Sequence, residues 1–276
     1  MTQKAFDRPA RHRLRGPLAA LAIGLVAATG ATTAGASTMG TADMATPGIS
    51  SFSTFGTKWG SPAFGTAGGV VTYSYVPFGT SCGALCGGSG IVGDLATFMP
   101  VGFEAAIDAA FGVWEAVADI SFVEVADDGA EMGTATTGGD IRLSVVGVDG
   151  PSGTLAFAFF PPPNSGTSYD GDIFFDFQEP WSLGVAPGFF DLFLVAAHEI
   201  GHAIGLEHED TELALMNPIY NPFLTGLTPD DIAGAQYIYG PASVIPLPAG
   251  LPLYAGALML GAGFVLRRRK APADVG

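Results

Sequence analysis

The stretch that most constrains how this chain can fold runs from His198 to His208. The chain has four histidines, and three of them lie in this run. Residues four apart lie on the same face of an α-helix, so a helix here presents His198 and His202 side by side. Gly205 can end that helix and let the chain turn back. We expect the turn to bring His208 in from a loop as a third metal ligand.

This donor set predicts a catalytic zinc site. Three neutral imidazole nitrogens leave one tetrahedral position for water, which is the arrangement of catalytic rather than structural zinc. Glu199 lies beside the first histidine. A His-Glu-x-x-His pair alone also occurs on ordinary amphipathic helices. The glycine and third histidine at the required spacing, followed by Ala-Leu-Met-Asn-Pro at residues 214–218, favour zinc over coincidence.

Together these residues resemble the signature of the metzincin metalloproteases, His-Glu-x-x-His-x-x-Gly-x-x-His with a downstream methionine turn. Within the metzincins the chain is most similar to the matrixins, the matrix metalloprotease group. The resemblance covers about residues 57–240 and includes Lys58-Trp59 and the run at residues 149–159. It implies an α+β fold, with a twisted, mostly parallel five-stranded sheet, three helices and an active-site cleft.

The hydrophobic pattern supports the same order of elements. It predicts a strand at residues 70–76, a helix at 102–117, strands at 120–125, 140–146 and 154–160, and a final helix that begins after Thr228. We expect the strand at 154–160 to offer its edge to an extended peptide, which would add to the sheet as another strand.

The two ends of the chain carry targeting features. Residues 1–36 have a basic start, a short apolar run and a small-residue site at 34–36, which together predict a secretory signal peptide. A membrane anchor is the alternative, although the apolar run is short for a bilayer span. Residues 37–56 are rich in Ser, Thr, Gly and Ala and are expected to be a flexible linker. The catalytic-type domain is then expected at residues 57–241.

Residues 242–276 are predicted to be a C-terminal sorting signal. Pro-Leu-Pro-Ala at 246–249 precedes an apolar helix that ends near residue 266, and four basic residues follow at 267–270. The arrangement resembles bacterial sorting signals that an exosortase-type enzyme cuts, which implies transient membrane anchoring and display outside the cell. A permanent tail anchor is the alternative. The apolar segment is only just long enough to span a bilayer, which needs ~20 residues.

Charge excludes two classes of partner. Of the eleven Lys and Arg residues, only Lys58 and Arg142 lie outside these ends, whereas 24 of the 26 acidic residues do. The exported part therefore carries a net charge of about −22. Such a surface repels nucleic acid and anionic membranes, and favours divalent cations.

Cys82 and Cys86 are the only cysteines, and in an exported chain we expect them to form a small disulfide loop. The alternative is an inhibitory thiolate on the zinc, as in latent matrixins. These cysteines follow the first predicted strand and lack the Pro-Arg-Cys-Gly context of that inhibitory segment.

A structural calcium site is also predicted. A carboxylate and exposed carbonyls at residues 149–153 supply the oxygen donors that calcium prefers, and more carboxylates follow. The expected calcium ligands are Asp149, Asp172, Asp176 and Glu179, although turn-forming Asp and Gly would look the same. Asp149, Asp176 and Glu179 are assigned by resemblance to matrixins, and Asp172 because it lies among the same carboxylates in the sequence. Matrixins usually hold a second, structural zinc through histidines, where this chain has Phe157 and Phe174. We therefore expect one zinc ion and apolar packing of the two phenylalanines.

The resemblance also assigns roles around the zinc. Glu199 is expected to act as general base on the attacking water. Met216 is expected to form the hydrophobic floor beneath the metal, although a core methionine gives the same sequence. Pro218 and Tyr220 match the wall of the pocket that receives the substrate side chain just after the cleaved bond.

Three functional hypotheses follow from these residues. The first is an exported zinc endopeptidase that cleaves extracellular proteins or peptides. The second is a surface-displayed binding or structural protein that keeps the metzincin fold without turnover. The third is a zinc hydrolase acting on something other than peptides. All three ligands and Glu199 are present, which favours an enzyme.

Overall fold

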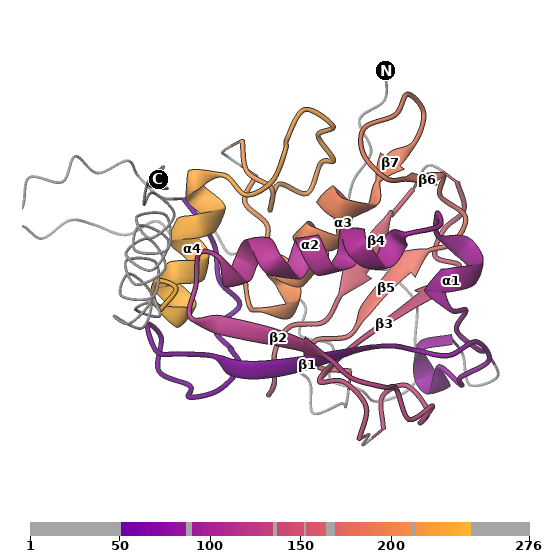
Figure 1. Ribbon diagram of the computed structural model, residues 1–276, viewed down its shortest axis with the longest axis horizontal. Coiled ribbons are helices and arrows are strands. Elements are labelled where there is room, and N and C mark those ends of the chain that lie inside the picture. The colour runs from indigo at the N-terminus through magenta and orange to yellow at the C-terminus, as the bar shows by residue number, and fades with distance from the viewer. Residues whose placement is uncertain are drawn as a thin grey trace, which may run out of the picture. The chain divides into compact units, whose positions relative to one another are not determined.

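A mixed five-stranded sheet forms the base of the domain (Figure 1). The computed structural model describes residues 51–86, 90–134, 137–151, 153–163, 169–210 and 213–243. The strands are β1 (Gly69–Tyr75), β2 (Ile120–Glu124), β3 (Ile141–Val146), β4 (Ala156–Ala158) and β5 (Ile173–Asp176). Their spatial order is β2-β1-β3-β5-β4, and only β4 runs antiparallel to its neighbour. The predicted mostly parallel five-stranded sheet is therefore confirmed.

Three longer helices accompany the sheet, as predicted, together with shorter elements that the sequence did not suggest. The longer helices are α2 (Phe103–Glu115), α3 (Leu192–Ala203) and α4 (Pro229–Tyr239). The shorter elements are the 3₁₀ turn η1 (Gly83–Cys86), the single-turn helix α1 (Leu95–Phe98) and a two-stranded pair, β6 (Trp181–Ser182) with β7 (Phe190–Asp191). Asp94 starts α1 by accepting a hydrogen bond from the Thr97 amide at 2.9 Å.

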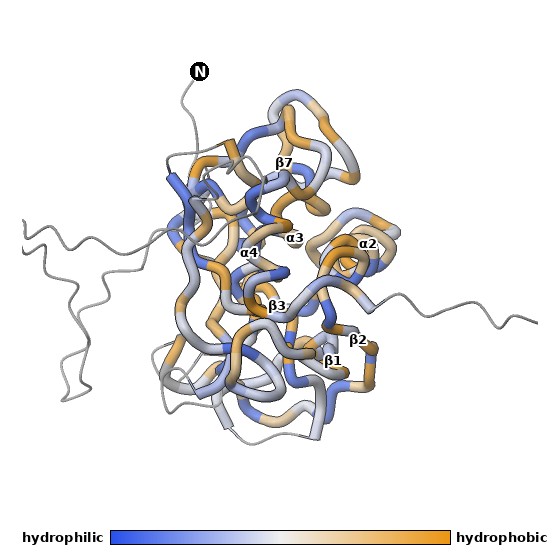
Figure 2. The backbone as a smooth tube through the Cα atoms, turned by 90° about the vertical axis from the view of Figure 1, so that its left-hand side faces the viewer, coloured by the Kyte–Doolittle hydropathy of each residue, from blue (hydrophilic) through white to orange (hydrophobic). Residues whose placement is uncertain are grey.

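The main core lies between the sheet and helices α2 and α3. In α2 the buried residues recur at helical spacing: Phe103, Ile107, Ala110, Phe111 and Trp114. The coil of α2 in Figure 2 accordingly carries both orange and blue segments. All six residues of β3 are buried, because this central strand is covered on both faces. A second apolar cluster, which includes Val76, Val92 and Phe174, is separate from the main core.

Two predicted boundaries differ from the structure. Residues 51–56 were expected to belong to a flexible linker, but they pair with the chain that follows α3: the Phe55 amide donates to Gly205 O at 3.0 Å, and the Glu207 amide donates to Ser53 O at 2.9 Å. Composition gives no sign of such a long-range pairing. The strand expected at 154–160 is regular only over β4, although the Phe159 amide still donates to Asp172 O at 2.9 Å.

The predicted signal peptide, the sorting signal and most of the linker lie outside the described residues. Within the described part of the chain, no helix is long and apolar enough to cross a membrane.

The two basic side chains of the domain are both buried. Lys58 is 4% exposed, and its Nζ donates to the carbonyl oxygens of Trp59 and Ser61 at 2.9 and 2.7 Å. Arg142 on β3 is 2% exposed and forms a two-pronged ion pair with Asp127, at 2.8 Å on both carboxylate oxygens. Burial raises the pKa of Asp127, but hydrogen bonds from Arg142 and Gly129 outweigh it, so the pKa lies below its usual value.

Replacing Arg142 tests how much this ion pair holds the loop after β2. Arg142→Met leaves the Asp127 carboxylate buried without its guanidinium, and we expect a loss of about 3–5 kcal/mol in the free energy of unfolding. Urea titration measures the loss. The double variant Arg142→Met/Asp127→Asn removes the stranded charge and should be more stable than the single variant. Equal stability of the two variants would contradict a buried-charge origin.

Candidate metal centre

Helix α3 places His198 and His202 on one face. Asp191 caps its first turn, because the side chain accepts a hydrogen bond from the Phe193 amide at 3.1 Å. Every residue of α3 except Phe193 is buried, so the helix runs through the core. The indole nitrogen of Trp114 on α2 donates to Ala197 O at 2.9 Å and fixes the helix directly before the first histidine.

Gly205 turns the chain back after α3, as predicted. Its φ is +107°, a conformation that glycine adopts readily and other residues rarely adopt. The Gly205 amide donates to His202 O and the Leu206 amide donates to Gly201 O, both at 2.9 Å, so two of the last helix carbonyls are satisfied. His208 follows three residues later and returns to the two helix histidines.

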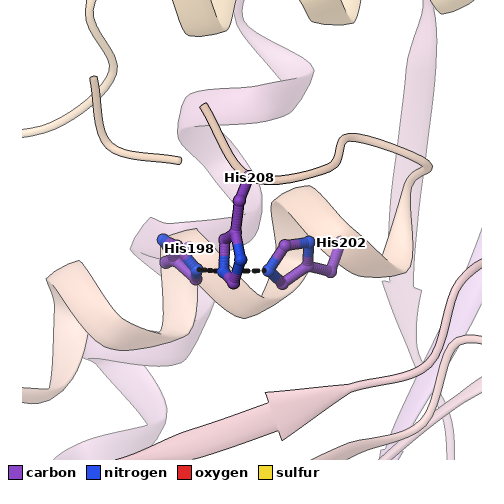
Figure 3. Close-up of side chains that lie close together, drawn as sticks. All are labelled: His198, His202 and His208. Carbon is purple, nitrogen blue, oxygen red and sulfur yellow. Dashed lines mark hydrogen bonds between the residues drawn. The ribbon is translucent and has the colours of Figure 1, made fainter. Parts of the chain in front are cut away.

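The three imidazoles converge, as Figure 3 shows. The Nε2 atom of His208 lies 3.2 Å from that of His198 and 3.1 Å from that of His202. Two of the rings are held from behind, since Nδ1 of His198 faces Leu215 O at 2.7 Å and Nδ1 of His202 faces Leu206 O at 2.8 Å. A carbonyl oxygen only accepts, so both Nδ1 atoms carry the proton and both Nε2 atoms present lone pairs.

These nitrogens fit a tetrahedral zinc ion. Zn–N bonds of ~2.0–2.1 Å at tetrahedral angles separate neighbouring nitrogens by ~3.3 Å, close to the observed spacing. Without a cation, a neutral His208 supplies at most one ring proton to these contacts, so the two facing lone pairs have a single proton to share. Within the described residues, the triad is the one group of three or more His, Cys, Asp or Glu side chains with all ligating atoms within 4.8 Å of one another.

The environment of the triad keeps the imidazoles neutral. Burial, together with the neighbouring His208, lowers the pKa of His202 to about 3. Burial lowers the pKa of His208 to about 4, against a weaker opposing effect of Asp210. The pKa of His198 also lies well below its usual value, chiefly because of burial. Neutral imidazole is the form that binds a metal.

Glu199 and Met216, the other residues assigned to the centre, are both buried. Glu199 directly follows the first ligand on α3 and is fully buried. Met216 is 2% exposed, and a methyl group added at Gly201 would collide with its sulfur, so the methionine packs closely against α3.

The expected pocket residues lie beside the start of α3. Tyr220 is 8% exposed, its hydroxyl accepts a hydrogen bond from the Asp191 amide at 3.0 Å, and its ring meets that of Phe190 edge-on. Pro218 is half-buried, two residues after the methionine. The backbone carbonyls that hold the histidines were not predicted, because no side-chain pattern marks them.

The carboxylates expected to share a calcium ion do not all come together. The Gly153 amide donates to Glu179 at 3.0 Å, and the Thr154 amide donates to Asp149 at 3.0 Å. Asp176 belongs to the same group. Burial raises the pKa of its carboxyl, a hydrogen bond from the Asp149 backbone amide lowers it, and the charge of Glu179 raises it, so both residues lie close to Asp176.

Asp172 lies apart from that group, and its role as a calcium ligand stays a prediction. Its Oδ1 accepts a hydrogen bond from the Arg142 amide at 3.0 Å. Asp172 and Asp176 are separated by four residues along extended strand β5, a distance of about 13 Å. One ion cannot reach both side chains.

Phe157 and Phe174 pack together, as expected for these two positions. Their rings stack with centroids 5.0 Å apart and planes inclined by 14°. Phe159 and Tyr169 stack beside them at 5.2 Å, which completes an aromatic cluster over β4 and β5. Nearby, Cys82 is disulfide-bonded, and Cys86 is the only other cysteine in the sequence.

Two histidines on a buried helix and a third on the returning loop form a group that could hold a metal ion, on an α+β fold. The sequence profile of the matrixin family matches residues 91–240, more than half of the chain. The chain therefore belongs to the matrixin family, whose catalytic metal is zinc.

Individual relatives agree with this assignment. Matrix metalloproteinase-16 of Homo sapiens and that of Rattus norvegicus are each 41% identical over 158 residues, which cover 52% of this chain and 24% of the relative. Matrix metalloproteinase-20 of Homo sapiens is 40% identical over 144 residues, covering 51% of this chain and 28% of the relative. The chain thus spans about a quarter of the length of these relatives.

The neutral triad predicts how the stability of the metal-free protein depends on pH. Unfolded histidine titrates near 6.5, whereas His202 and His208 titrate at about 3 and 4 in the folded protein. Between these values the unfolded chain binds more protons, so the free energy of unfolding should fall as pH drops below about 6.5. Each histidine that stays neutral contributes up to ~1.4 kcal/mol per pH unit.

Urea titrations of chelator-treated protein at several pH values check this prediction. His208→Gln is the matched control, because it removes one of the titrating groups and should make the pH dependence less steep. A wild-type protein whose midpoint stays constant from pH 7.5 to 5 would contradict it.

Proposed function

We propose that this protein is an exported zinc-dependent endopeptidase that hydrolyses peptide bonds of extracellular proteins. The observation that carries the proposal is the convergence of three Nε2 atoms at 3.1–3.2 Å, next to a buried glutamate. A zinc ion held by His198, His202 and His208 supplies Lewis acidity and activates water near neutral pH.

Glu199 is the proposed general base. Its carboxylate accepts a proton from the attacking water as the water oxygen bonds to the peptide carbon. The same carboxyl group then delivers the proton to the departing nitrogen as the carbon–nitrogen bond breaks. Burial of Glu199 shields its carboxylate from bulk water.

An extended peptide is the proposed substrate form. In the described sheet β4 pairs with β5 alone, so its other edge has backbone donors and acceptors for a further strand. Pro218 and Tyr220 are the proposed wall of the pocket for the side chain after the cleaved bond, and Met216 is the proposed floor beneath the metal.

The proposed location is outside the cell, in a bacterium. The sequence supports it through the signal-like residues 1–36, the disulfide loop proposed for Cys82 and Cys86, and the sorting-type segment at residues 242–276. An exosortase-type enzyme is the proposed partner of that segment, which would anchor the chain in the membrane until it is cut.

The test of the enzyme proposal is the loss of its base. In purified full-length protein with zinc and calcium, Glu199→Gln should lower cleavage of casein or gelatin by about 10²–10⁴-fold, the usual contribution of a positioned acid or base. Glu207→Gln makes the same charge change on the loop between two ligands, and should keep most of the activity.

One result would favour an alternative function, and another would contradict the role proposed for Glu199. Wild-type protein that binds zinc but cleaves no protein or peptide library would support a non-catalytic binding or structural protein, or a hydrolase of other substrates. Equal activity of wild type and Glu199→Gln would exclude Glu199 as the base.

We also propose a structural calcium ion at Asp149, Asp176 and Glu179. Calcium that binds only the folded protein raises the free energy of unfolding, by ~2.7 kcal/mol at a hundred times its dissociation constant. In zinc-containing buffer, calcium should raise the urea midpoint of the wild type and of Asp172→Asn but not that of Asp176→Asn. Identical wild-type midpoints with and without calcium would contradict the site.

A further inference from the structure

A buried carboxylate from a distant helix supports the turn beneath the metal centre. Asp231 lies in the first turn of α4 and is 1% exposed. It accepts four hydrogen bonds, from the Thr228 amide (2.7 Å), the Thr228 hydroxyl (2.8 Å), the Leu215 amide (2.9 Å) and the Met216 amide (3.0 Å). Capping of α4 accounts for the two bonds from Thr228. The other two come from the methionine turn, 15 and 16 residues before Asp231 in the chain.

One of these bonds ends on the peptide group that holds a zinc ligand. The Leu215 carbonyl and the Met216 amide belong to the same planar peptide unit. The amide end donates to Asp231 Oδ1, and the carbonyl end accepts from Nδ1 of His198 at 2.7 Å. The carboxylate and the imidazole are therefore linked through a single peptide group.

This connection has an electronic consequence. A peptide amide that donates to an anion leaves more negative charge on its own carbonyl oxygen, because hydrogen bonds in a chain polarise one another. That oxygen then accepts more strongly from the imidazole. An acceptor behind a metal-bound histidine fixes the ring orientation and raises its basicity as a ligand.

The second helix histidine provides an internal comparison. Nδ1 of His202 bonds to Leu206 O, and the Glu207 amide of that same peptide unit donates to Ser53 O at 2.9 Å. Each histidine is thus linked through one peptide group to a further acceptor, and we call this arrangement a relay. The His202 relay ends on a neutral carbonyl, whereas the His198 relay ends on a buried carboxylate. Only the His198 relay places an anion one peptide group from the ligand.

We propose that Asp231 is a positioning residue of the metal centre, which orients and strengthens His198 as a zinc ligand through the Leu215–Met216 peptide group. The inference rests on the proposed zinc site, but not on peptide cleavage. Asp231 bonds to the backbone amides of Leu215 and Met216, and its proposed influence on His198 passes through the peptide unit.

The first experiment measures zinc affinity by competition with a chelator, using the full-length protein in a Glu199→Gln background so that it cannot digest itself. Asp231→Asn should weaken zinc binding by about 10–100-fold, as is usual for the loss of an outer partner of a ligand. Asp230→Asn makes the same change on the preceding residue, whose carboxylate bonds to the Ser51 and Phe52 amides instead, and should shift affinity less than about threefold.

Stability is measured separately by urea titration of the metal-free variants. A merely structural Asp231 would lower the midpoint while the folded protein kept its zinc affinity, and that result would overturn the proposal. Wild-type protein that takes up no zinc would overturn both the proposed function and this inference. Zinc uptake without proteolysis would overturn the enzyme function alone.

A second experiment needs no variant at Asp231 and so does not depend on how that variant folds. The Leu215 and Met216 amides both donate to the same carboxylate, but only the Met216 peptide unit also accepts from His198. Zinc loading should therefore move the Met216 amide proton and nitrogen resonances more than those of Leu215. Equal or absent shifts at the two amides would overturn the relay.

Discussion

The close approach of three imidazole nitrogens inside an apolar core is the constraint on which the rest of the domain depends. With both helix histidines protonated at Nδ1, their Nε2 lone pairs point at a third nitrogen only 3.1–3.2 Å away. A neutral His208 brings at most one proton to these two contacts, so a cation among the rings satisfies the nitrogens better than the ring protons alone. The surrounding fold holds the side chains together, and backbone carbonyls fix the orientation of His198 and His202.

The elements around α3 can be understood as supports for that geometry. Trp114 of α2 bonds to the helix one residue before the first ligand, and residues 51–56 pair with the turn that leads to the third. The parallel sheet supplies the opposite wall of the core. Because α3 is buried on nearly all sides, it can shift little without opening the core, which keeps the ligands at fixed positions.

Local patterns in the sequence predicted the parts of the site that depend on local geometry. The spacing of His198 and His202 requires only helical periodicity, and Gly205 was recognised because few other residues adopt its backbone conformation. Asp172 is close to Asp176 and Glu179 in the sequence, which suggested a shared calcium site, but an extended strand separates it from Asp176 in space. The bond from His198 to the Leu215 carbonyl and the pairing of residues 51–56 depend on long-range packing. The Leu206 carbonyl is only four residues from His202, but a backbone acceptor carries no signal in side-chain type.

The burial of both cationic side chains has a consequence for how other proteases meet this domain. Between Arg15 and Arg267 the sequence contains no basic residue except Lys58 and Arg142. Trypsin-like enzymes cut after exposed lysine or arginine. Here the side chains of Lys58 and Arg142 are both buried and hydrogen-bonded within the domain. Within the described part of residues 51–243, the folded domain therefore presents such enzymes with no exposed lysine or arginine. Cleavage after Lys58 or Arg142 would indicate that the domain had opened.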